Sequence, residues 1–277
     1  MFEGDPGVRM GTSSWSEKSW VGSFYPEETG PADFLKHYSL RYDTVEIDST
    51  YYATPRDSTV KNWRKRTPDE FLFTAKVPRE ITHERVLVDA RESMEIFVES
   101  MQWLGEKLGP LLLQFPYFNR KTFSGPVQFL QRLERFLPHF TGEVSLVVEV
   151  RNPNWVHPNL VEVVEGCGAT LAWVDQGWMP EAQEWIERLG PPRGQNGYFR
   201  FLGDRKETEA LTQTWDQQVL DPRERLQPWV EIMKSFRASG GDVFGFFNNH
   251  YAGHAPATLE DFRTLWESDH SSSSSGE

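Results

Sequence analysis

The chain has 277 residues, is 14% aromatic and carries a formal net charge of -12. This acidic balance argues against general nucleic-acid binding, which depends on a basic surface that neutralises phosphates. The single cysteine, Cys167, excludes an internal disulfide framework and is typical of a reducing compartment. No apolar run approaches the roughly 20 residues that span a membrane, and residues 1–7 do not resemble a signal peptide. We therefore expect a cytoplasmic protein.

Short apolar runs alternate with amphipathic patterns along the whole chain. Strands are predicted to begin near Val8, Thr44, Phe71, Leu111, Ser145, Thr170, Gly197 and Val243. Helices are predicted over residues 31–38, 58–66, 90–108, 126–137, 160–165, 181–189, 223–238 and 256–267. Eight strands alternating with helices indicate an α/β protein, a single-domain (β/α)8 TIM barrel over residues 8–268. We expect residues 1–7 to be a flexible N-terminus and residues 269–277 to be a disordered serine-rich tail.

An open doubly wound sheet is the alternative fold. It is disfavoured because the first predicted strand leads into Thr12-Ser13-Ser14-Trp15 rather than into a glycine-rich phosphate loop.

Polar residues lie at the C-terminal ends of most of the predicted strands. In the segment VSLVVEVRNPNW, Glu149 and Arg151 share one face, because strand residues two apart point the same way. Such charges cost desolvation energy unless they are satisfied. The other strand ends carry Glu46, Asp48, Lys76, Gln114, Asp175, Arg200, Asn248, Asn249 and His250. Because active sites of TIM barrels lie at the C-terminal ends of the strands, we expect these groups to meet at that mouth.

Residue type suggests a role for each group. Glu149 is the first candidate for a general acid or base, with Glu46 as its partner. Lys76, Arg151 and Arg200 are expected to neutralise an anion. Amides and an imidazole would orient the ligand, and aromatic rings would form the pocket wall. The predicted ligand-binding set is completed by Gln114, Trp155, Asp175, Asn248, Asn249, His250 and Tyr251.

Three chemistries can be compared for this set. A glycosidase needs two carboxylates about 5 to 10 Å apart, for which Glu46 and Glu149 are the candidates. A phosphate or other anion site is favoured by the three cations, because TIM barrels often bind phosphate after strands seven and eight. The amides that open the last helix, near residues 253–256, would contribute to such a site.

A catalytic metal is the third chemistry. His83, His250 and His254 follow strands three and eight, but Gly253 indicates a loop rather than a helical ligand pair. We therefore predict no metal site. No nicotinamide or flavin motif is visible, so we also expect no cofactor.

Seven segments between Gly11 and Leu259 resemble those of a known family. They read GTSSW with FYP, VEIDSTYYATP, TPDEFLFTAKVPREITHE, LGEKLGPLLLQFP, VVEVRNPNWV, YFRFLGD and FFNNHYAGHAPATL. Together and in this order they resemble domain of unknown function 72, also called the YecE-like family. The resemblance implies a TIM-barrel fold and brings no established activity.

The sequence thus predicts a charged pocket at the barrel mouth that binds a small anionic or polyhydroxylated molecule. Hydrolysis of phosphodiester or glycosidic bonds is the candidate reaction. A non-catalytic nucleotide or single-stranded nucleic-acid binding module is one alternative, and an interaction scaffold is the other. A polar network that only neutralises itself at the barrel end is the structural alternative.

Overall fold

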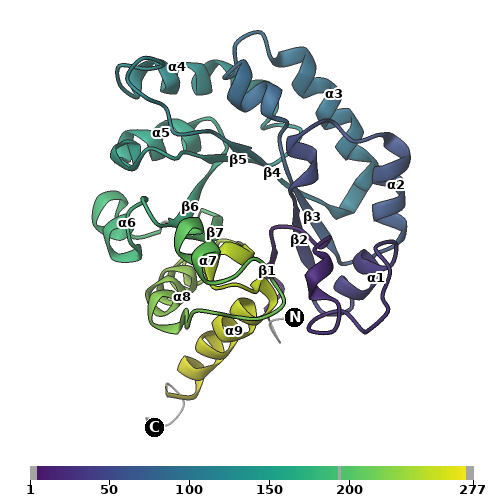
Figure 1. Ribbon diagram of the computed structural model, residues 1–277. Helices are drawn as coiled ribbons and strands as arrows, with labels where there is room; N and C mark the ends of the chain where they lie inside the picture. Colours follow the sequence, from purple (N-terminus) through teal and green to yellow (C-terminus); the bar gives the residue numbers. More distant parts are fainter. Residues whose placement is uncertain (1–4, 193–194, 273–277) are drawn as a thin grey trace.

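A computed structural model describes residues 5–192 and 195–272 (Figure 1). All eight described strands are parallel and form one sheet in the order β1-β8-β7-β6-β5-β4-β3-β2. Their bounds are β1 Val8–Thr12, β2 Thr44–Ile47, β3 Leu72–Lys76, β4 Leu108–Gln114, β5 Leu146–Glu149, β6 Thr170–Gln176, β7 Gly197–Gly203 and β8 Val243–Phe247. The predicted TIM barrel is confirmed.

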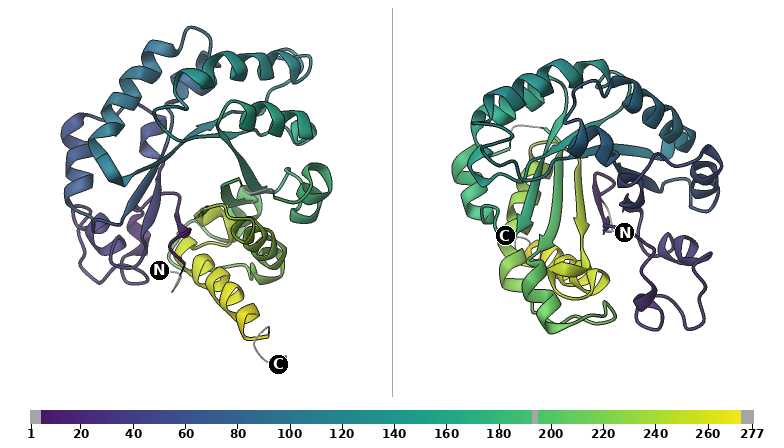
Figure 2. Two further views of the ribbon diagram at one scale, coloured as in Figure 1. Left: turned by 180° about the vertical axis from the view of Figure 1, so that it is seen from behind. Right: turned by 45° about the horizontal axis from the view of Figure 1, so that its top comes forward.

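Helices surround the strands, as Figures 1 and 2 show. They are α1 Phe34–Tyr38, α2 Asp57–Lys65, α3 Arg91–Met101, α4 Val127–Phe136, α5 Pro158–Gly166, α6 Ala182–Leu189, α7 Arg205–Leu211, α8 Arg223–Ala238 and α9 Ala255–Ser272. The core lies between the two layers, where Trp185 of α6 and Trp229 of α8 are almost completely buried. No helix within the described ranges is long and apolar enough to cross a lipid bilayer.

The barrel has a seam between β1 and β2, which share no ladder hydrogen bonds within the described residues. The buried Tyr38 hydroxyl joins the two strands: it accepts from Thr12 N at 2.8 Å and donates to Thr44 O at 3.1 Å. A Cβ atom at Gly11 would lie 2.2 Å from Thr44 O, so the close approach of the strands requires glycine there. A helix side chain thus replaces the missing ladder.

No helix is predicted at α7, and the last helix is predicted to end earlier than it does in the structure. The segment of α7, RKETEAL, lacks an apolar stripe, although Asp204 caps it by accepting from Lys206 N at 2.8 Å. α9 continues to Ser272 and enters the predicted tail, because each residue added to an existing helix gains a hydrogen bond. Part of the predicted flexible N-terminus is also tied down, since Arg237 Nε donates to Asp5 Oδ2 at 2.7 Å. Residues 1–4 and 273–277 lie outside the described residues.

Candidate functional site at the barrel mouth

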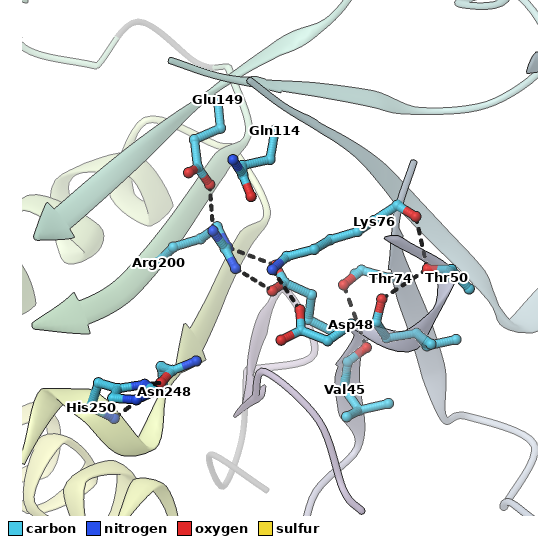
Figure 3. A network of polar contacts seen from close by, with 12 residues as sticks. Val45, Asp48, Thr50, Thr74, Lys76, Gln114, Glu149, Arg200, Asn248 and His250 are labelled. Atoms are coloured by element: carbon cyan, nitrogen blue, oxygen red, sulfur yellow. Dashed lines mark hydrogen bonds and ion pairs between the residues drawn. The ribbon is translucent and has the colours of Figure 1, made fainter. Parts of the chain in front are cut away.

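Arg200, on β7, is the centre of a buried ion network inside the barrel (Figure 3). Its Nε and Nη2 atoms donate to the two carboxylate oxygens of Glu46 at 2.8 and 2.6 Å. Its Nη1 atom donates to Glu149 Oε2 at 2.5 Å. All three side chains have 0% exposure. The Tyr198 hydroxyl, two residues before Arg200 on the same face of β7, donates to Glu46 Oε2 at 2.8 Å.

Both carboxyl groups of this network are held in the ionised form. Burial alone would raise their pKa values, but the charges of Arg200 and Lys76 keep the pKa of Glu46 below its usual range. Arg151 and Arg200 do the same to the pKa of Glu149. Burial would lower the pKa of Arg200, but Glu149 and Glu46 raise it well above its usual value. Three fixed charges therefore lie at the base of the site.

Arg151 extends the network toward solvent. Its Nε atom donates to Glu149 Oε1, and its Nη1 atom donates to Gln176 Oε1 at 2.8 Å. Its side chain is 14% exposed, whereas that of Glu149 is completely buried. Gln114 lies beside Glu149 in the ladder between β4 and β5, and both appear together in Figure 3. Arg151 thus lies at the rim and Glu149 below it.

Lys76 and Asp48 form a second ion pair at the mouth. The Lys76 Nζ atom lies 2.7 Å from Asp48 Oδ1, and the side chains are 13% and 34% exposed. Burial raises the pKa of Asp48 even though Lys76 acts in the opposite direction. Asp48 is therefore the carboxyl group of this mouth that takes up a proton most readily, and it is accessible to a ligand.

His83 belongs to this region, although it is absent from the predicted set. It lies in a π-helical turn, Glu80–Glu84, that follows β3. Burial, followed by the charges of Arg79, Arg151 and Lys76, lowers the pKa of His83 to about 4. Its ring meets that of Tyr51 edge-on, with the centroids 5.1 Å apart. The sequence indicates only that His83 lies in the loop after the third strand, because neither a periodic pattern nor a motif points to a role for it.

The segment after β8 supplies one well-positioned amide. Asn248 Oδ1 accepts from the backbone N of His250 at 3.0 Å and lies 2.7 Å from its Nδ1. Asn249 has a structural role instead, since its Oδ1 accepts from Trp20 Nε1 at 3.2 Å and Ala255 N at 2.9 Å. The predicted anion site at the start of α9 is not supported, because Ala255 N is occupied in this way and Ala257 N donates to His254 Nδ1.

Three predicted ligand-binding residues do not lie in the mouth. The Asp175 carboxylate is behind the barrel wall, where Arg225 of α8 and the Tyr251 hydroxyl donate to it. Asp175 shares the outward face of β6 with Trp173, which stacks on Trp185 of α6 at a centroid distance of 5.1 Å. Tyr251 is 4% exposed and is part of the same packing.

Trp155 is the third residue, and it packs between loops and α4. It is 8% exposed, and its ring lies 5.6 Å from that of Phe118 and 5.2 Å from that of Phe129. Its size and its place in a loop did not distinguish a pocket wall from a core residue. Within the described residues, no group of three or more His, Cys, Asp or Glu side chains is arranged to hold a metal ion.

Comparison with known sequences gives the same family as the resemblance described above. The family model described as "Protein of unknown function DUF72" matches residues 9–276. UPF0759 protein YecE of Escherichia coli O157:H7 is 32% identical over 243 residues, which cover 80% of this chain and 85% of that protein. UPF0759 protein YunF of Bacillus subtilis is 26% identical over 270 residues, 90% of both chains.

Solved structures agree on the fold. The crystal structure of a DUF72 family protein from Thermotoga maritima has a TM-score of 0.71 and 29% identity, covering 94% of this chain and 99% of that one. A D-psicose 3-epimerase has a TM-score of 0.56 at 12% identity, covering 93% and 96% of the two chains, which shows a shared fold alone.

Proposed function

The chain belongs to the DUF72 family of proteins of unknown function, and we propose that its barrel mouth binds a small anionic or polyhydroxylated molecule. The observation that carries this proposal is the pair of partly exposed cations, Lys76 and Arg151, above a buried network that fixes the position of Arg151. Both cations help to neutralise the buried carboxylates, and their partial exposure also allows contact with a ligand.

Both cations have hydrogen-bond donors to spare. An ammonium group has three donors, and Asp48 is the one ion-pair partner of Lys76 within the described residues. The Arg151 guanidinium donates through Nε and Nη1, and its Nη2 has no hydrogen-bond partner in residues 5–192 and 195–272. An anion such as a phosphate or carboxylate would use these donors.

The protonation state of Asp48 controls the charge of the site. Three cations, Lys76, Arg151 and Arg200, face three carboxylates when Asp48 is ionised, so the mouth is neutral. Protonation of Asp48, whose pKa is raised by burial, leaves an excess of one positive charge. Binding of an anion is therefore coupled to uptake of a proton by Asp48.

For the candidate hydrolysis, the geometry favours Asp48 as the proton donor over the sequence candidates Glu149 and Glu46. Arg200 lies between these two carboxylates and binds both, so a glycosidic bond cannot lie between them as a glycosidase requires. Glu46 and Glu149 act instead as positioning residues. Asp48 and the neutral His83 are the acid and base groups available for a phosphodiester.

One observation favours the non-catalytic alternative, a nucleotide-binding module. Trp178 follows β6 and is 52% exposed, and its Nε1 donates to Arg151 O at 3.3 Å. An exposed ring beside a cation can stack on a base. Nucleotide binding without turnover would support this alternative, and turnover would exclude it.

Titration calorimetry with inorganic phosphate tests the binding proposal. We expect phosphate to bind, and Lys76→Met and Arg151→Met each to weaken it at least tenfold, because each removes a charge-assisted contact of about 1.5 kcal/mol or more. Lys36→Met, at an exposed position on α1, is the matched control and should bind as the wild type does. Absence of phosphate binding, or equal affinity in all three variants, would contradict the proposal.

A further inference from the structure

A small cavity lies between the loops that follow β1 and β8. Its volume is about 180 Å³, which is below the roughly 300–1,000 Å³ of sites that hold a whole drug-sized ligand. It is therefore suited to one part of a ligand. Its lining includes Ser13, Ser14, Trp20, Trp215, Asn248 and His250.

Ser13 is a lining residue of this cavity with an unpaired polar group. The residue is 8% exposed, and its Oγ atom is buried without a hydrogen-bond partner among the described residues. Ser13 N donates to Phe247 O at 2.9 Å, which continues the ladder between β1 and β8 and brings Ser13 beside Asn248. A buried hydroxyl without a partner costs free energy, and a bound polar group would remove that cost.

Asn248 presents a fixed donor next to it. Two contacts from His250 hold its Oδ1, and Glu209 Oε1 lies 3.3 Å from Nε2 of the same imidazole. This arrangement leaves Asn248 Nδ2 with no hydrogen-bond partner in the described part of the chain. Figure 3 shows this nitrogen turned away from His250. His250 therefore acts as a positioning residue for the amide.

The cavity carries no cation, in contrast to the side of the mouth with Lys76 and Arg151. Among the residues that the structure describes, no lysine or arginine lines it, and burial lowers the pKa of His250, which keeps the imidazole neutral at neutral pH. Glu17 lines it as a carboxylate that accepts from Ser19 N and Oγ. The hydroxyl and amide groups of this lining suit the hydroxyl groups of a sugar, and the Glu17 carboxylate, with no cation among the described lining residues, disfavours an anion.

We propose that the ligand is a sugar with an anionic group, a sugar phosphate or a sugar acid. Its hydroxyl groups bind in the cavity between Ser13 and Asn248, and its anionic group binds at Lys76 and Arg151. This inference rests on the proposed function, because it assigns the anion to the same two cations.

A calorimetric series tests the inference. The probes are hexose 6-phosphates, pentose 5-phosphates, hexuronates and aldonates, with the neutral parent sugars and inorganic phosphate for comparison. We expect at least one anionic sugar to bind at least tenfold more tightly than both inorganic phosphate and its neutral parent. The phosphate and carboxylate members of the series distinguish the two kinds of anion.

The variant Ser13→Ala tests whether the sugar binds in this cavity. It should weaken the tightest anionic sugar about threefold to tenfold, the effect of one hydrogen bond, and leave inorganic phosphate unchanged. Because the Ser13 hydroxyl has no partner among the described residues and its burial costs free energy, the variant should melt at or above the wild-type temperature, which separates binding from folding. Ser58→Ala, at an exposed position on α2, is the matched control.

The outcomes separate this inference from the proposed function. The inference is overturned, and the anion site stands, when phosphate binds through Lys76 but no sugar in the series improves on it. Equal binding of the tightest sugar by Ser13→Ala and the wild type also overturns it. Failure of phosphate to bind overturns the proposed function and this inference with it.

Discussion

Arg200 on β7 and Glu46 on β2 are joined by two parallel hydrogen bonds of 2.8 and 2.6 Å, although β8 and β1 lie between their strands. This pair crosses the interior near the seam where β1 and β2 lack a ladder. Both side chains are fully buried, so the pair is stable only while each charge keeps its partner.

Replacement of Glu46 tests the structural part of the network. Glu46→Gln removes the carboxylate that binds Arg200 through two hydrogen bonds and leaves the buried network with one excess positive charge, and we expect a loss of about 3 to 5 kcal/mol in the free energy of unfolding. Urea denaturation measures it. The exposed Glu106→Gln should change stability by no more than about 0.5 kcal/mol. A Glu46→Gln protein as stable as the wild type would refute the role of this pair.

Glu149 should behave differently from Glu46. In Glu149→Gln, Arg200 keeps both hydrogen bonds to Glu46, so the loss of stability should be smaller than in Glu46→Gln. Arg151 loses the carboxylate that positions it, so phosphate should bind more weakly. The two measurements are urea denaturation and calorimetry on the same preparation. Unchanged phosphate binding together with a large loss of stability would assign Glu149 to structure alone.

The raised pKa of Asp48 predicts how anion binding depends on pH. An anion prefers the mouth with Asp48 protonated, so affinity should be highest below the Asp48 pKa and fall as pH rises through it. Sulfate is the appropriate probe, because it stays a dianion across this range. Asp48→Asn should bind sulfate with little dependence on pH. An identical pH profile in the wild type and in Asp48→Asn would exclude Asp48 as the coupled group.

His254 should make the fold sensitive to acid. Burial lowers its pKa from 6.5 to about 4, and its Nδ1 accepts from Ala257 N at 3.2 Å. Between these pH values the unfolded chain binds a proton that the folded chain does not, so stability should fall as pH drops through this window.

The variant His254→Asn keeps a helix-capping acceptor and removes the titration. Its stability should change less than that of the wild type between pH 6.5 and 4, while His83, whose pKa is also lowered to about 4, retains a part of the effect. Thermal denaturation at several pH values measures both. Parallel curves for the two proteins would show that His254 does not contribute.

The sequence predicts the barrel and the buried network for a common reason. A period of two assigns Glu46, Glu149 and Arg200 to the inner face of their strands, and the parallel order brings these strand ends to one mouth. The same rule indicates that Asp175 shares a face with Trp173, and a large apolar neighbour is typical of the outward, helix-covered face.

The features of the site that the sequence did not predict depend on tertiary contacts. Loops have no fixed periodicity, so sequence alone cannot distinguish Trp155, which packs on Phe118, from an aromatic residue that lines a pocket. The position of His83 is set by a π-helical turn. Ser13 is a candidate ligand-binding residue because its hydroxyl group has no hydrogen-bond partner in the described structure. Both properties arise only after the chain has folded.

Native mass spectrometry of the chain purified without added ligand tests the central claim most directly, because it requires no assumption about the ligand. We predict a small molecule bound one-to-one, lost in Lys76→Met and kept in the control Lys36→Met. A wild-type chain with no bound molecule, or equal occupancy in Lys76→Met, would contradict a ligand site at the barrel mouth.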